Sequence, residues 1–130
     1  MLDLSELKLT DRGPIYLQLV RYVKSAIVSG HVSPGEEMPS RRLVSSLLGV
    51  NPNTVQKAYR LMEEEGLIVS HPGSGSVVTF TDETAAKLRR QLILEDTREY
   101  LASLKAMGLT LQEAEELLRE VWSEEKEESR

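Results

Sequence analysis

The chain has 130 residues, a formal net charge of −5, no cysteine, and no apolar run long enough to span a membrane. These features exclude disulfides, thiol catalysis and cysteine metal sites, and they suit one compact domain with an appendage better than two independent cores. The first six residues lack the basic start and apolar middle of a signal peptide, so we expect a cytoplasmic protein.

The acidic excess lies entirely in the C-terminal part of the chain. Residues 1–81 contain 8 Lys or Arg and 8 Asp or Glu, whereas residues 82–130 contain 8 and 13. The 25 residues from Met38 to Met62 contain no Asp or Glu, but they carry four basic side chains: Arg41, Arg42, Lys57 and Arg60. This acid-free window predicts a surface that meets a polyanion, and the alternative is a solvated face on an ordinary three-helix domain.

A first helix is expected from Gly13-Pro14 to about Ser29. Proline suits the first turn of a helix because the N–H that it lacks would be unpaired there. Five apolar residues recur at helical spacing and predict a core-facing stripe: Ile15, Leu19, Val23, Ala26 and Ile27. Gly30 then supplies a left-handed stop, and Pro34-Gly35 marks a turn.

Two short helices follow, separated by Leu48-Gly49-Val50-Asn51-Pro52, which is the spacing of a helix-turn-helix. Ser40 is a favoured N-cap for the second helix, and Gly49 terminates it. Four side chains of this helix are expected to face inward: Leu43, Val44, Leu47 and Leu48.

The third helix has a clear start, because Asn51 is a favoured cap and Pro52 fits the first helical position. Gly66 ends it. Four residues at helical spacing face inward: Val55, Ala58, Tyr59 and Met62. The other face is polar and carries Asn53, Thr54, Gln56, Lys57 and Arg60. Such a helix can enter the DNA major groove, where Asn and Gln suit adenine edges and Lys suits guanine or phosphate.

Two short β segments are expected next, Leu67 to Ser70 and Ser76 to Phe80, joined by a polar tip over residues 71–75. This hairpin would form a wing beside the third helix, and it must pack on the helices because two strands alone are marginal. Residues 1–80 are therefore predicted to form a winged helix-turn-helix domain in a mainly α, α+β protein.

Residues 81–130 are predicted to form a helical hairpin. The first helix runs from about Glu83 to Met107, and Gly108 breaks it. Its apolar stripe contains Leu88, Leu92, Ile93, Tyr100, Leu101, Leu104 and Met107. Thr110 and Glu113 make a capping box for the second helix, and the charged tail after Ser123 is expected to fray. The second stripe contains Leu111, Ala114, Leu117, Leu118, Val121 and Trp122.

These two apolar stripes need a partner. The simplest one is the same hairpin of a second subunit, and the alternative is that the hairpin folds back on the winged domain of its own chain. We expect a homodimer held by eight of these residues: Leu88, Leu92, Ile93, Tyr100, Leu104, Leu111, Leu118 and Trp122.

Taken together, these residues resemble the GntR family of bacterial transcription regulators. The matching segments, in chain order, are Pro14–Leu19, Gly30, Pro34-Gly35, Met38–Leu43, Leu48–Val50, Asn53–Val55, Ala58-Tyr59, Leu61, Glu65-Gly66 and Gly73–Gly75. The length and the two-helix tail are similar to those of the YtrA subfamily. That resemblance implies a homodimeric repressor of its own operon, often one that encodes an ABC transporter. Larger relatives add a separate effector domain. These 130 residues leave no room for one, so we expect no such domain here. The small-molecule effector, if the protein has one, is not indicated by the sequence.

The resemblance also implies which residues meet a palindromic operator in double-stranded DNA. The arginine typical of the family matches Arg42, whereas Arg41 stands at a variable position; both lie where the second helix approaches the DNA backbone. The family often has arginine where this chain has Pro52, so one base contact is lost. The remaining DNA-binding residues are expected at the turn, on the third helix and at the wing tip: Asn51, Asn53, Thr54, Gln56, Lys57, Arg60, His71, Gly73, Ser74 and Gly75.

No arrangement typical of an enzyme is found in the sequence. His31 and His71 lie in separate turns, and no cluster has metal-ligand spacing. We expect the run Glu63-Glu64-Glu65 to be a solvated charge run, and the alternative is an acid–base pair. We therefore expect no catalysis, no cofactor and no metal. The competing function is a protein-interaction adaptor, which would have no need of an acid-free window.

Overall fold

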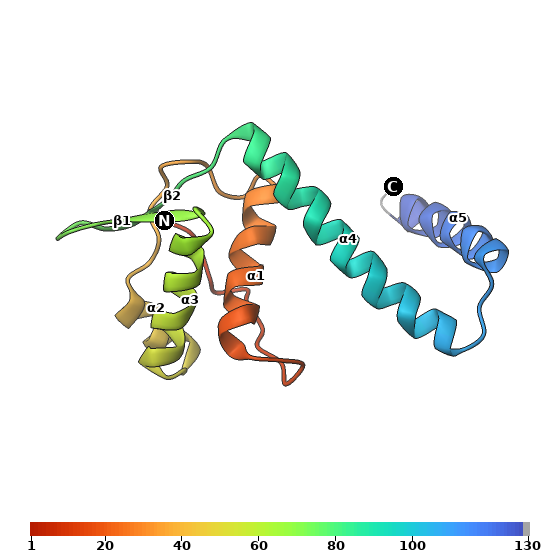
Figure 1. Ribbon diagram of the computed structural model, residues 1–130, viewed down its shortest axis with the longest axis horizontal. Coiled ribbons are helices and arrows are strands. Elements are labelled where there is room, and N and C mark those ends of the chain that lie inside the picture. The colour runs from red at the N-terminus through yellow and green to blue at the C-terminus, as the bar shows by residue number, and fades with distance from the viewer. Residues whose placement is uncertain (129–130) are drawn as a thin grey trace. The chain divides into compact units, whose positions relative to one another are not determined.

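The computed structural model describes residues 1–128 and consists mainly of helices (Figure 1). The elements, in chain order, are α1 (Ile15–Val28), α2 (Arg41–Leu48), α3 (Pro52–Glu64), β1 (Ile68–His71), β2 (Gly75–Val78), α4 (Asp82–Ala106) and α5 (Leu111–Glu128). The chain divides into two compact units, Met1–Leu92 and Ile93–Arg130. The predicted α+β, mainly α architecture with a winged helix-turn-helix is confirmed.

The ends of α2 and α3 form as their residue types predict. The Ser40 hydroxyl accepts a hydrogen bond of 3.1 Å from the Leu43 N–H, and Gly49 ends α2 with a φ of 65°. The Asn51 side chain accepts one of 2.8 Å from the Asn53 N–H, and Pro52 occupies the first helical position. These caps set the length and direction of the turn that joins the two helices.

The core of the first unit lies among α1, α3 and the hairpin. All four residues predicted on the inner face of α3 are buried: Val55, Ala58, Tyr59 and Met62. Four of the five predicted on α1 are also buried: Leu19, Val23, Ala26 and Ile27. Ile15 is 38 % exposed instead, because it is the first residue of α1 and lies at the end of the helix.

The prediction for α2 is wrong for two leucines. Val44 is fully buried and Leu48 is half-buried, but Leu43 and Leu47 are 44 % and 54 % exposed. The physical reason is that α2 has only 8 residues and packs on α3 along one narrow side. A two-turn helix with one neighbour buries a single row of side chains.

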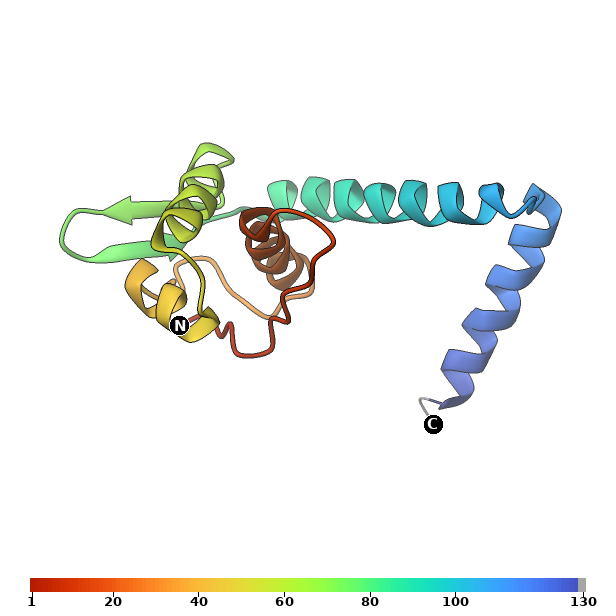
Figure 2. The ribbon, with the colours of Figure 1, turned by 90° about the horizontal axis from the view of Figure 1, so that it is seen from below.

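The wing is an antiparallel hairpin that extends past α2 and α3 (Figure 2). Ile68 pairs with Val78 and Ser70 with Ser76, so both strands begin and end within two residues of the predicted positions. The segment before α2 supports β2 through hydrogen bonds from Met38 N–H to the Ser76 carbonyl, 2.9 Å, and from Val78 N–H to the Glu36 carbonyl, 2.8 Å. The wing is therefore attached to the segment before α2 along the outer edge of β2.

The first unit includes more of the chain than predicted. Leu2 and Leu4, which precede the first predicted element, are buried in the core. Leu88 and Leu92 of α4 are buried in the same core, 8 % and 5 % exposed. The two leucines expected at a dimer interface are thus covered within one chain, and the unit extends past the predicted boundary at residue 80.

The second unit contains the rest of α4 and the described part of α5. The predicted capping box is confirmed: the Thr110 N–H donates to Glu113 Oε1 at 3.1 Å, and the Glu113 N–H donates to Thr110 Oγ1 at 3.2 Å. α5 continues to Glu128, past Ser123, where fraying was expected. Its large apolar side chains are exposed, with Leu118 at 67 % and Trp122 at 70 %.

Candidate nucleic-acid interface

The outer face of α3 presents a row of polar side chains. Burial of the apolar stripe turns the remaining positions outward, so Asn53, Gln56, Lys57 and Arg60 are all exposed, and Thr54 is half-buried. The structure therefore brings together the five residues that sequence analysis placed on one face. Their amide, hydroxyl and cationic groups can donate and accept hydrogen bonds at the edges of bases and at phosphates.

Asn51 differs from this group. It is exposed, but its side-chain oxygen is occupied in capping α3 through the hydrogen bond to the Asn53 N–H. Its contribution is therefore to the position of Asn53 and the first turn of α3 rather than to a free base-reading oxygen.

Lys57 has a partner that the sequence did not indicate. Its Nζ lies 4.1 Å from the centroid of the Tyr16 ring in the first turn of α1. This is the geometry of a cation–π contact. The lysine is therefore held over α1 at one edge of the polar face.

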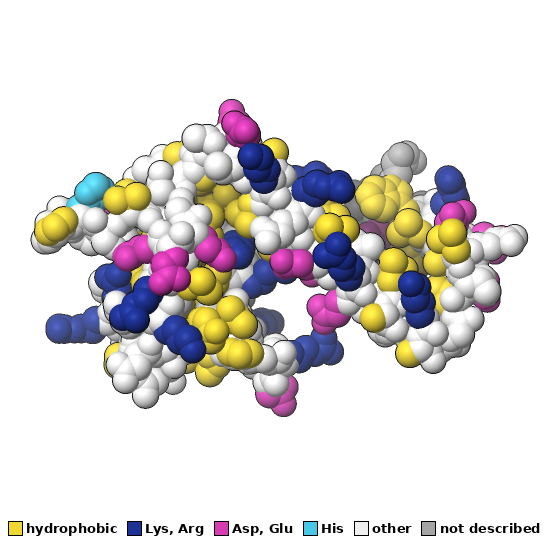
Figure 3. Space-filling model, viewed as in Figure 1, with side chains coloured by type: hydrophobic (Ala, Val, Ile, Leu, Met, Phe, Trp, Pro, Cys, Tyr) yellow, Lys and Arg dark blue, Asp and Glu magenta, His cyan; other side chains and the backbone are white. Residues whose placement is uncertain are grey.

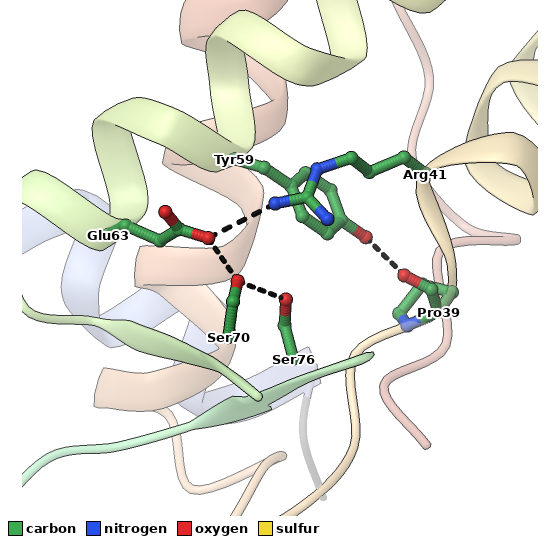
Figure 4. Close-up of polar contacts among 6 residues, drawn as sticks. All are labelled: Pro39, Arg41, Tyr59, Glu63, Ser70 and Ser76. Carbon is green, nitrogen blue, oxygen red and sulfur yellow. Dashed lines mark hydrogen bonds and ion pairs between the residues drawn. The ribbon is translucent and has the colours of Figure 1, made fainter. Parts of the chain in front are cut away.

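The two neighbouring arginines at the start of α2 have different environments. Arg42 is exposed. The Arg41 Nη2 lies 3.1 Å from Glu63 Oε1, and its guanidinium lies 4.8 Å from the centroid of the Tyr59 ring (Figure 4). Burial raises the pKa of the Tyr59 phenol, and the nearby Arg41 charge partly opposes that effect. Arg42 is thus the more exposed of the two arginines, and Arg41 is half-buried.

The tip of the wing is open to solvent. His71, Gly73, Ser74 and Gly75 are exposed, and a hydrogen bond of 3.0 Å from the Ser74 N–H to the His71 carbonyl closes the turn. Gly73 and Gly75 have φ of 78° and 81°, which is a region that other residues adopt only with strain. Short side chains at such a tip let its backbone approach another molecule closely.

Basic side chains gather over α2 and the start of α3. Figure 3 shows several Lys and Arg there, with Asp and Glu clustered beside them toward the end of α3. The sequence explains this separation, since the first acidic residues after Met62 are Glu63, Glu64 and Glu65. A cationic surface with a polar helix beside it is suited to a polyanion.

Other kinds of site find little support in the described part of the chain. Within residues 1–128 no group of three His, Cys, Asp or Glu side chains is placed to hold a metal ion. In the same residues, no helix has the length and apolar character needed to cross a membrane.

Comparison with known proteins points to one family. Residues 15–78 match the family described as bacterial regulatory proteins, gntR family. The chain is 29 % identical over 109 residues to the HTH-type transcriptional repressor YtrA of Bacillus subtilis, covering 83 % of this chain and 84 % of that protein. It is 31 % identical to YtrA from Sulfolobus acidocaldarius, a GntR-family transcription factor, with a TM-score of 0.56 over 76 % of this chain and 99 % of that one.

A further similarity concerns a complex. The crystal structure of the AraR DNA-binding domain with operator ORX1 contains a chain that is 28 % identical to this one. The similarity covers 55 % of this chain and 87 % of that one, with a TM-score of 0.50.

Proposed function

Because the chain belongs to the GntR family of bacterial regulatory proteins, a family of transcription regulators, we propose that it is a repressor that binds a palindromic operator as a homodimer. The observation that carries this proposal is the exposed polar face of α3, which lies in a stretch of the chain free of Asp and Glu. An interaction adaptor would not require that exclusion. The similarity to the transcriptional repressor YtrA supports repression as the mode of control. The proposal includes repression of its own operon, one that encodes an ABC transporter, and action in the cytoplasm.

In this proposal α3 enters the major groove. Asn53 and Gln56 read base edges, because their amides can bond an adenine in two places. Thr54 lies beside them, and Lys57 and Arg60 meet guanine or phosphate. Arg42 contacts the DNA backbone from the start of α2. The similarity to the AraR domain in its operator complex supports double-stranded DNA as the ligand.

The wing supplies the second contact. His71 and the tip residues Gly73, Ser74 and Gly75 meet the minor groove or a phosphate beside the site read by α3. The exposed tip and its left-handed glycines support this role, because the backbone can approach the duplex without hindrance from side chains.

The homodimer rests on the second unit. Tyr100, Leu111, Leu118 and Trp122 are each at least two-thirds exposed, and Ile93 is about half exposed. Together with the half-buried Leu104 they give the two helices an uncovered apolar surface, which soluble chains normally cover. A second copy of the same surface would bury it and place two α3 helices on a two-fold symmetric operator.

The test compares contacts that carry sequence information with contacts that do not. An operator is first selected from a randomised duplex library, and the full chain is titrated on it and on a scrambled duplex. Asn53→Ala and Gln56→Ala should each weaken operator binding by about 1–3 kcal/mol per half-site. Their affinity for the scrambled duplex should stay close to that of the wild-type chain. Arg42→Ala should weaken binding to both duplexes. It should also lower the salt slope, which is the slope of log affinity against log salt concentration, by about one per subunit.

Equal losses on both duplexes for the Asn53 and Gln56 variants would show that α3 does not read sequence. Failure of the wild-type chain to select any duplex, or binding without salt dependence, would favour the adaptor function instead.

A further inference from the structure

One carboxylate joins the three elements of the proposed DNA interface. Glu63, near the end of α3, accepts hydrogen bonds at Oε1 from Arg41 Nη2 of α2, at 3.1 Å, and from the Ser70 hydroxyl of β1. The Ser70 hydroxyl also lies 2.9 Å from that of Ser76 on β2 (Figure 4). The chain of contacts therefore runs from α2, through α3 (the helix proposed to read the bases, called the reading helix below), into both strands of the wing.

The half-buried Arg41 makes a second contact, with Tyr59. Its guanidinium stacks over Tyr59, and the Tyr59 hydroxyl donates a hydrogen bond of 2.5 Å to the Pro39 carbonyl just before α2. Its Nε atom is buried. If Arg41 turned toward a phosphate, Glu63 would lose its cationic partner and would present an unpaired carboxylate next to the DNA. Charge repulsion therefore favours the paired arrangement when DNA is bound.

We propose that Arg41 is a positioning residue, which sets the wing against the reading helix through Glu63 and Ser70 and does not itself contact DNA. This inference rests on the proposed function. It replaces the expectation that both arginines at the start of α2 meet the duplex, and it leaves that role to the exposed Arg42.

The wing depends on such an attachment. Each strand has 4 residues, and a hairpin of that size has little stability alone, so its direction is set by what it packs against. Ser76 is buried at 5 % exposure, and it pairs with Ser70 directly before the last pair of the hairpin, His71 with Gly75. Contacts at Ser70 and Ser76 therefore fix the strands next to the exposed tip, residues 71–75, and determine where the tip meets the duplex.

The test uses a variant that changes no charge. Ser70→Ala removes the link between Glu63 and the wing, and it should weaken operator binding about tenfold with an unchanged salt slope. Arg41→Ala should cause a loss at least as large, because it breaks the same chain of contacts and also leaves the Glu63 carboxylate without its cationic partner, and its salt slope should stay unchanged. The double variant should bind about as well as the weaker single variant, because both changes break the same chain of contacts.

Arg42→Ala is the matched control, since Arg42 is the next residue on the same helix. Its loss should add to that of Ser70→Ala, and its salt slope should fall by about one per subunit. A second readout is cleavage protection of the duplex. Arg41→Ala and Ser70→Ala should lose minor-groove protection where the wing tip lies and keep major-groove protection by α3, whereas Arg42→Ala should keep both.

A lower salt slope for Arg41→Ala, or losses for Arg41→Ala and Ser70→Ala that add, would show that Arg41 contacts DNA directly and would overturn the inference. So would intact wing protection in the Ser70→Ala complex. The proposed function is tested separately, because its failure would appear as a wild-type chain that selects no operator. Thermal unfolding of each variant checks that it is folded, and Ser70→Ala, at an exposed position, tests the link even if Arg41→Ala unfolds.

Discussion

The ammonium of Lys57 in α3 lies 4.1 Å from the centre of the Tyr16 ring in α1. The contact ties the polar face of α3 to the first turn of α1, which begins at Ile15. α1 and α3 also pack against each other more extensively than any other two elements. The orientation of α3 is therefore set by α1 on one side and by α2 on the other.

The first prediction concerns this contact. Tyr16→Leu and Lys57→Gln should each lower the free energy of unfolding by about 0.5–1 kcal/mol, the range of an exposed cation–π pair, and the double variant should lose less than the sum. Urea unfolding of the four proteins gives the coupling. Arg60→Gln is the control, because Arg60 lies on the same face. Additive losses for Tyr16 and Lys57 would mean that the contact contributes no stability.

Local patterns predicted the first unit well where neighbours in sequence decide the structure. The caps at Ser40 and Asn51, the stop at Gly49 and the inner face of α3 all depend on residues within one or two turns, and all are confirmed. The wing followed from two β-prone runs around a Gly-rich tip, and its ends moved by only one or two residues.

Contacts between distant parts of the chain could not be predicted in the same way. The stripe that contains Leu88 and Leu92 shows that one face of α4 is apolar, but it does not show which surface covers that face. In the structure, Leu88 and Leu92 are covered by the core of the same chain. Leu2 and Leu4 lie in a segment too short to show periodicity. Arg41 looked like any exposed cation, because nothing local marks its pairing with Glu63, 22 positions away.

The second prediction concerns the boundary of the first unit. A fragment of residues 1–97 should be more stable than one of residues 1–80, because the longer fragment buries Leu88 and Leu92. Each buried leucine contributes about 1.5–3 kcal/mol, so the midpoint of urea unfolding should be clearly higher for the longer fragment. Arg89→Ala in the 1–97 fragment is the exposed control and should leave the midpoint unchanged, whereas Leu88→Ala should lower it. Equal midpoints for the two fragments would contradict the placement of α4 in this core.

The third prediction concerns assembly. Leu118→Glu and Trp122→Glu place charges on the exposed apolar surface of α5, so the full chain should sediment as a monomer while its circular dichroism stays helical. Operator affinity should fall with the loss of the second half-site. Glu120→Gln, an exposed change on the same helix, should leave the dimer intact. A wild-type chain that sediments as a monomer at micromolar concentration would refute the proposed homodimer.

The last prediction concerns pH and Tyr59. Burial holds the pKa of this phenol well above its usual value of about 10, so the folded chain keeps it neutral while the unfolded chain ionises it. Its contribution to stability is therefore complete below pH 10 and is lost as the pH rises above that value. The loss amounts to about 1.4 kcal/mol of unfolding free energy per pH unit until the folded chain also titrates.

Tyr59→Phe isolates this effect from the other groups that titrate at alkaline pH, because they are the same in both proteins. At neutral pH the variant should be less stable by about 1 kcal/mol, since it lacks the hydrogen bond to the Pro39 carbonyl. Above pH 10 the wild-type chain should lose stability faster, so the difference should narrow and then reverse. Urea unfolding of both proteins between pH 8 and about 11 measures it, and a difference that stays constant would mean that Tyr59 ionises freely in the folded chain.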